Sequence, residues 1–208
     1  QDYTMRKSLN FTNIRISPQN QTERHFYDIS NFAFNYSYNE VFSRDINTAY
    51  NTIKDYQGGL SYTYNTRPNN IRPFSSLGGI FNSPWLRLIK DFNFYYMPSS
   101  FTFQTNVQRH YNAFEYRNIN NPNFSYEPSF NKDFLWDRNY RLQFDLTRSI
   151  KLNYSATNRA RIDEPEGMVN KRKAPQQYDR WKDSVMTNIQ NLGRTTDFQQ
   201  KVNATYRV

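Results

Sequence analysis

A strict alternation of large rings and small polar residues constrains the fold of this chain more than any other feature. Between Asn31 and Asn39 the sequence reads NFAFNYSYN, so every second residue is Phe or Tyr, and Asn, Ala or Ser stand between them. Successive side chains of a β-strand point to opposite faces of its sheet. The pattern therefore predicts a strand with one aromatic face and one polar face.

The same alternation recurs along the chain and predicts about eight strands, several of them joined in sequence as antiparallel hairpins. We expect them near residues 8–16, 25–42, 47–65, 91–96, 101–111, 140–146, 150–162 and 201–208. The Gly58-Gly59 pair is interpreted as a bend or bulge within the third strand. Two longer insertions are expected at about 70–90 and 163–196, and a polar loop at 118–131.

One helix is predicted inside the second long insertion. Apolar residues recur there at helical spacing, and a glycine stands where a C-terminal cap would be needed. These residues are Tyr178, Trp181, Val185, Ile189 and Leu192, with Gly193 as the cap. We expect a short amphipathic helix that packs on its own protein rather than on a membrane surface or a partner.

The composition agrees with strands that have two unlike faces. The 208 residues include 17 Phe, 17 Tyr and 27 Asn, yet the mean hydropathy is only -0.97. No apolar run approaches the roughly 18 residues of a membrane-spanning helix, which excludes a helical membrane protein and leaves a β-barrel open. The chain begins QDYTMRK and ends inside an alternating segment, KVNATYRV. We therefore expect it to be a piece of a larger protein.

The two predicted faces differ in chemistry enough to suggest different surroundings. One face carries Arg141, Asp145, Lys151, Asn153, Arg159 and Arg161, and the other carries Phe32, Phe34, Tyr36, Phe144, Leu152 and Tyr154. Charges buried in a soluble core would each cost several kcal/mol, so the charged face must meet water. The aromatic face then needs lipid or a second protein layer.

Strand length and residue type favour lipid over a second layer. The predicted strands are longer than the roughly 5–6 residues usual in globular proteins, and their apolar faces use Phe and Tyr rather than Val and Ile. We predict an all-β, antiparallel transmembrane β-barrel, with the charged set lining the lumen and the ring set facing lipid. An eight-stranded barrel is too narrow for long charged side chains in several layers. The whole chain, 1–208, is therefore expected to be an arc of one much larger barrel domain.

Five motifs in order resemble the SprA/Sov family, the giant outer-membrane barrel of the type IX secretion system in Bacteroidota. They are SLNFTNIR, HFYDISNFAFNYSYNE, LIKDFNFYYMPSSFTFQTNVQRHYN, NRARIDEPEG and WKDSVMTNIQNLGRTTDFQQ. The resemblance implies a protein-conducting translocon that passes folded cargo carrying a type IX C-terminal signal. It also implies a PorV-type shuttle barrel, a periplasmic plug protein and the remainder of the barrel polypeptide as partners.

Two other functions stay open at this point: a small-solute outer-membrane channel, and a soluble basic β-sheet module. The net charge of +9 is spread along the chain, which favours solvated charge over a polyanion site. Rings and charges lie on opposite predicted faces, which argues against nucleic-acid binding. His25, His110 and the acidic cluster Asp163, Glu164 and Glu166 lack the spacing of a metal site. No enzyme, metal or cofactor is expected.

Overall fold

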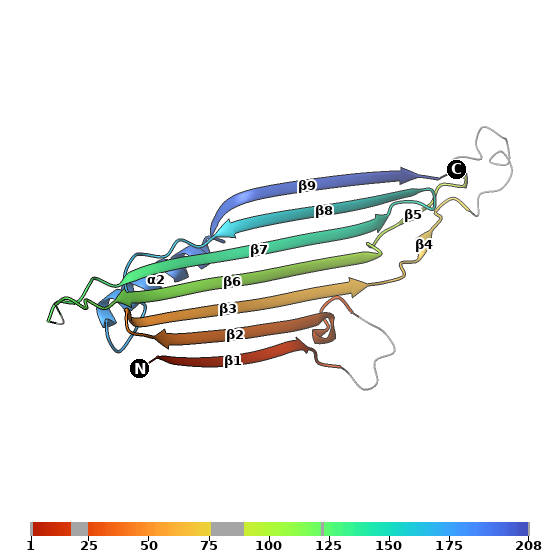
Figure 1. Ribbon diagram of the computed structural model, residues 1–208. Helices are drawn as coiled ribbons and strands as arrows, with labels where there is room; N and C mark the ends of the chain where they lie inside the picture. Colours follow the sequence, from red (N-terminus) through yellow and green to blue (C-terminus); the bar gives the residue numbers. More distant parts are fainter. Residues whose placement is uncertain (1, 18–24, 76–89, 122, 208) are drawn as a thin grey trace.

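A single antiparallel sheet of seven strands dominates the computed structural model, which describes residues 2–17, 25–75, 90–121 and 123–207 (Figure 1). The strands lie in the order β1-β2-β3-β6-β7-β8-β9. Their bounds are β1 Tyr3–Ile14, β2 Phe32–Arg44, β3 Thr48–Asn65, β6 Ser100–Tyr116, β7 Ser129–Asp145, β8 Ile150–Arg161 and β9 Arg194–Tyr206. The predicted all-β, antiparallel class with one helix is confirmed.

Four small elements complete the described fold. They are the 3-10 turn η1 Ile29–Asn31, the two-residue strands β4 Asn70–Ile71 and β5 Phe94–Tyr95, and the helix α2 Pro175–Gln190. The prediction that 91–96 forms a strand of the main sheet is wrong, because only Phe94–Tyr95 is extended and it pairs with β4. β3 is paired with β6 along almost its whole length. The segment 91–96 therefore finds no free edge of β3 to pair with. Residues 76–89 of the first predicted insertion lie outside the described residues.

The helix ends where the sequence predicts its glycine cap. Gly193 has a φ of +70°, and its backbone N–H donates to the carbonyl oxygen of Asn188 at 2.7 Å. A Cβ at this position would lie 3.2 Å from both the Cβ of Ala160 and the carbonyl oxygen of Arg161. Glycine therefore reverses the chain and also lets the helix end approach β8 closely.

The prediction for the Gly58-Gly59 pair was a bend or a bulge, and the bulge is wrong. Its pairing with β2 and with β6 continues without interruption. A Cβ on Gly58 would meet the Cγ2 of Val107 at 3.1 Å, so this glycine makes room for a cross-strand neighbour. The pairing shifts instead near Asn13, near Thr48 and between Arg159 and Ala160.

β7 and β9 begin earlier than the alternation predicts. β7 starts at Ser129, inside the predicted loop 118–131, and β9 starts at Arg194. In the first half of β7, Lys132 pairs with Tyr111 of β6 and Phe134 pairs with Arg109. Charged and aromatic residues therefore share one face there. A polarity pattern alone could not identify that half as strand.

At the end away from α2 the strand ends shift along the strand direction between β2 and β9, and at the α2 end the shift falls mainly between β7 and β8 (Figure 1). Phe32, Tyr62, Phe103, Tyr140, Ala156 and Gln200 form one row directly across the sheet. β2 begins at this row, whereas β9 continues six residues beyond it to Tyr206. At the opposite end β8 stops opposite Leu135, six residues short of the row through Ser129. The two ends of the sheet therefore slant in the same direction.

The sheet is open, and several of its buried residues lie beneath α2. β1 and β9 do not pair with each other, so each has an unpaired edge. Ala160 and Ile162, at the end of β8, and Val185, on α2, are each at most 6% exposed. None of the described helices is long and apolar enough to cross a membrane.

Candidate functional site

The candidate site is the pair of sheet faces, because directly paired residues of an antiparallel sheet point to the same side. We call the side of Phe32, Tyr62, Phe103 and Tyr140 the ring face. Ring centroids lie 4.9 Å apart for Phe32 and Tyr62, and 5.0 Å apart for Phe103 and Tyr140. The rings therefore continue from strand to strand as one aromatic surface.

All six residues predicted to face lipid lie on the ring face, in two groups. Phe32, Phe34 and Tyr36 project from β2, and the first two are 38% and 43% exposed. Phe144 pairs with Leu152, and Tyr154 pairs with Leu142, on β7 and β8. Two strands, β3 and β6, separate the groups, so the six residues mark opposite sides of one surface.

The half of the ring face away from α2 contains an open apolar groove. Its lining comes from β2, β3, β6, β7 and the two loops beside them. The lining residues are Phe26, Phe32, Tyr62, Tyr64, Met97, Pro98, Phe101, Phe103, Tyr140 and Leu142. The groove is open, and Phe32 at its edge is 38% exposed.

The other half of the ring face is covered by α2 and contains a buried ion pair. The guanidinium of Arg109 donates to both carboxylate oxygens of Glu164 at 2.7 Å, and the indole N–H of Trp181 donates to the same carboxylate at 2.5 Å. The Glu164 side chain is 2% exposed. Arg109 also lies over the ring of Trp181, 4.9 Å from its centroid. We call Arg109, Glu164 and Trp181 the helix latch.

A second buried cation holds the end of the helix. Arg138 is 5% exposed, and its guanidinium donates to the Oδ1 of Asn158 and to the carbonyl oxygen of Leu192. Lys132 donates to the carbonyl oxygen of Pro165 at 2.7 Å. The helix therefore packs on its own protein, as expected. The alternation of aromatic and polar residues in the sequence did not reveal that half of the ring face is polar and covered by α2.

The six residues predicted to line a lumen lie together on the opposite face, which we call the polar face. The register places them on β7 and β8, where Asp145 pairs with Lys151 and Asp137 pairs with Arg159. Oppositely charged atoms lie 3.7 Å apart in the first pair and 3.9 Å apart in the second. Arg161 lies 3.4 Å from Asp133. Most of these charges therefore face a neighbour of opposite sign.

The polar face has a second region, on β2, β3 and β6, that is nearly free of charge. It presents amides and hydroxyls, from Asn35, Ser37, Asn39, Gln57, Ser61, Thr63, Gln104, Asn106 and Gln108. The exception is Asp55, whose carboxylate lies 2.6 Å from the Nδ1 of His110. Our sequence reasoning missed this division, although the uncharged residues between the rings of 31–39 signal it.

The acidic cluster around Asp163 is a structural anchor. Glu164 belongs to the helix latch, and Asp163 accepts two hydrogen bonds from the Arg194 guanidinium, at 2.9 and 3.1 Å. These bonds lower the pKa of the Asp163 carboxyl below its usual value. Within the described ranges, no three His, Cys, Asp or Glu side chains are arranged to hold a metal ion.

The comparisons with known proteins add no relative: no family model matches the chain, and no curated protein sequence does either. The functional assignment therefore depends on the two faces and on the motifs of the sequence.

Proposed function

We propose that this chain forms part of the wall of a wide transmembrane β-barrel that conducts folded proteins across a bacterial outer membrane. One observation carries the proposal: an uncovered aromatic surface stands directly behind a polar surface on the same strands. In lipid, sheets persist only when every backbone group is paired, which requires closure into a barrel. The unpaired edges of β1 and β9 would then pair with flanking strands from the rest of the polypeptide.

The slant of the sheet ends supports a barrel. A shift of six residues corresponds to about 20 Å along the strands, and the five steps from β2 to β9 span about 24 Å across them. These lengths give a strand tilt of about 40°, within the range of outer-membrane barrels. A closed barrel needs a net stagger of this kind to join its first and last strands.

Strand length supports a wall that extends beyond the membrane on the α2 side. β3, β6 and β7 have 17 or 18 residues, whereas a tilted strand crosses a bilayer with about 9–11. The half that contains the apolar groove would meet hydrocarbon. The half beneath α2 would extend beyond the headgroups. Its polar side chains would then not have to be buried in lipid, which would cost free energy.

The chemistry of the polar face supports protein cargo. Paired charges on β7 and β8 and neutral amides on β2, β3 and β6 offer a passing protein neither a field of one sign nor a large apolar patch. Such a surface adheres weakly to folded proteins. Arg141, Asp145, Lys151, Asn153, Arg159 and Arg161 would line this path.

The motif resemblance narrows the proposal to the type IX translocon of Bacteroidota. In that assignment the cargo carries a type IX C-terminal signal. The partners are a PorV-type shuttle barrel and a periplasmic plug protein.

Single cysteines test the assignment of the two faces, since the sequence contains no cysteine. Gln104→Cys lies on the polar face and Phe103→Cys on the ring face of the same strand. In the full-length protein in its native membrane, a water-soluble maleimide should label the first and leave the second unmodified. A lipid-soluble maleimide should label Phe103→Cys. Equal labelling of both by the water-soluble reagent would contradict a lipid-facing ring face.

The same variants distinguish a protein-conducting pore from a small-solute channel. A secreted protein stalled during export should form a crosslink with Gln104→Cys and none with Phe103→Cys. The type IX partners should also co-purify with the full-length chain. Reproducible absence of both results would favour a solute channel.

A further inference from the structure

The two ends of the sheet carry different charge. Away from α2, the described residues that flank the strands include six basic and two acidic side chains. At the α2 end, the corresponding segments include six basic and eight acidic side chains. Of the two ends, the one where the apolar half of the ring face terminates therefore carries the basic excess.

Five arginines at this end are exposed, and we call them the arginine rim. They are Arg15, Arg67, Arg72, Arg148 and Arg207. Among the described residues, none of these five forms an ion pair with an acidic side chain. The basic residues of the polar face differ, because many of them have an acidic partner within 4 Å. Unpaired, exposed guanidinium groups remain available to an external anion.

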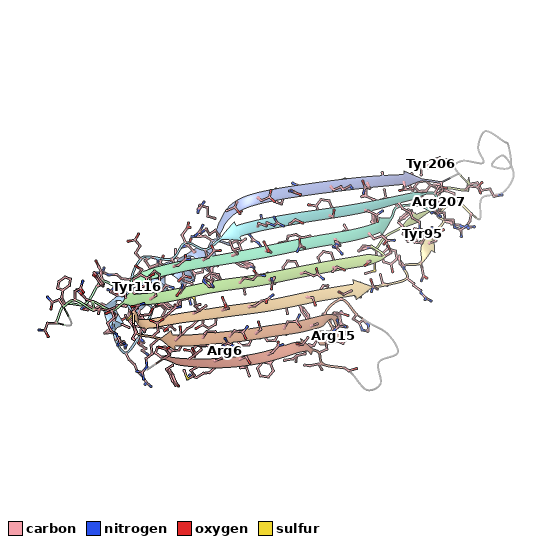
Figure 2. The ribbon with its side chains drawn as sticks, in the orientation of Figure 1. Arg6, Arg15, Tyr95, Tyr116, Tyr206 and Arg207 are labelled. Atoms are coloured by element: carbon pink, nitrogen blue, oxygen red, sulfur yellow. The ribbon has the colours of Figure 1, made fainter. Side chains whose placement is uncertain are left out.

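Backbone contacts hold part of the arginine rim beside exposed rings. The N–H of Arg207 donates to the carbonyl oxygen of Ser149 at 2.8 Å, and the N–H of Arg148 donates to the Oδ1 of Asn93 at 2.9 Å. Tyr95 is tied to the same place, because its N–H donates to the carbonyl oxygen of Leu146. Figure 2 shows Arg207 next to Tyr206 and near Tyr95, at the end of the sheet away from α2.

This order of surfaces matches one boundary of a bilayer. Along the ring face, the apolar groove is followed by exposed tyrosines such as Tyr206, which is 68% exposed, and then by the arginines. Tyrosine prefers the headgroup level, where its ring meets hydrocarbon and its hydroxyl meets water. Arginine forms bidentate hydrogen bonds with phosphate oxygens. The layer directly outside the tyrosines is where lipid phosphates lie.

We propose that the arginine rim binds the phosphate groups of anionic lipids in the leaflet that surrounds this end of the barrel. The inference rests on the proposed function, since it requires the ring face to lie in a bilayer. A soluble polyanion fits less well, because the rim extends around the margin of an apolar surface instead of forming one basic cleft.

The test uses the full-length protein inserted into vesicles of phosphatidylcholine alone or mixed with phosphatidylglycerol. After extraction into a neutral detergent, native mass spectrometry counts the phosphatidylglycerol molecules that the protein retains. A variant with all five rim arginines changed to glutamine should retain at least roughly fivefold fewer, since one basic residue near an anionic surface contributes about that factor in affinity. The matched control changes five basic residues at the α2 end to glutamine, and it should retain as many as the native protein. These control positions are Lys171, Arg172, Lys173, Arg180 and Lys182.

The outcomes separate this inference from the proposed function. Failure to insert into vesicles of phosphatidylcholine alone would overturn both. Normal insertion with no excess of retained phosphatidylglycerol over phosphatidylcholine would overturn the lipid site alone, as would equal losses in the rim variant and its control. Displacement of the retained lipid by inorganic phosphate would also overturn it, by revealing a site for free phosphate.

Discussion

At the scale of single residues, the helix latch is the largest departure from the two-faced pattern. The alternation places Arg109 on the ring face, where a charge in contact with lipid would be costly. Glu164 and Trp181 compensate by pairing the guanidinium and covering it. In the proposed barrel, this local exception to the pattern marks the place where the ring face would stop contacting lipid.

Glu164→Gln should loosen the helix by leaving the Arg109 guanidinium buried without a counter-charge. Breaking one side of a buried ion pair costs about 3 kcal/mol or more. Amide hydrogen exchange across Pro175–Gln190 should therefore become faster, while exchange in β3 stays unchanged. Glu166→Gln is the control, because that side chain is exposed and makes no ion pair among the described residues. Unchanged exchange in the Glu164 variant would show that apolar packing alone holds α2.

At the scale of elements, glycines decide how closely neighbouring segments can approach. Gly58 makes room for Val107 within a regular strand, whereas Gly193 combines a left-handed backbone with close contact to β8. The sequence marks both positions as glycine, but it does not distinguish these roles. For that reason the predicted cap was confirmed and the predicted bulge was wrong.

Gly193→Ala should destabilise the end of α2 and the start of β9. The left-handed backbone conformation costs about 1 kcal/mol for a non-glycine residue, and the added methyl group would lie 3.2 Å from the backbone of Arg161. Limited proteolysis under native conditions should then cut the Gly193→Ala variant faster than the unsubstituted protein between 186 and 196. Gly59→Ala is the matched control, because its new methyl group would meet its neighbours at 3.5 Å or more. Equal cleavage rates in both variants would refute the role assigned to Gly193.

At the scale of the whole molecule, the two faces should differ sharply in their tolerance of charge. Leu142→Arg places a cation in the apolar groove. In the proposed barrel this cation would contact lipid, which costs about 2–4 kcal/mol near the bilayer midplane. The amount of heat-modifiable, folded protein in the outer membrane should fall. Gln143→Arg is the neighbouring control on the polar face, and it should assemble like the native protein. Equal assembly of both variants would mean that the ring face does not contact lipid.

The alternation by itself predicted five of the seven main strands over most of their length, the C-terminal part of β7 and of β9, and the division of their residues between two faces. The reason is local, since the side-chain direction of a strand repeats every two residues whatever the strand packs against. Only the tertiary structure revealed the early start of β7, the cross-strand pairing of charges and the covering of Arg109 by α2. These features depend on contacts between residues far apart in sequence. Arg109 and Glu164, for example, are separated by 55 positions. A local repeat in the sequence does not specify which distant side chain will lie opposite a given residue.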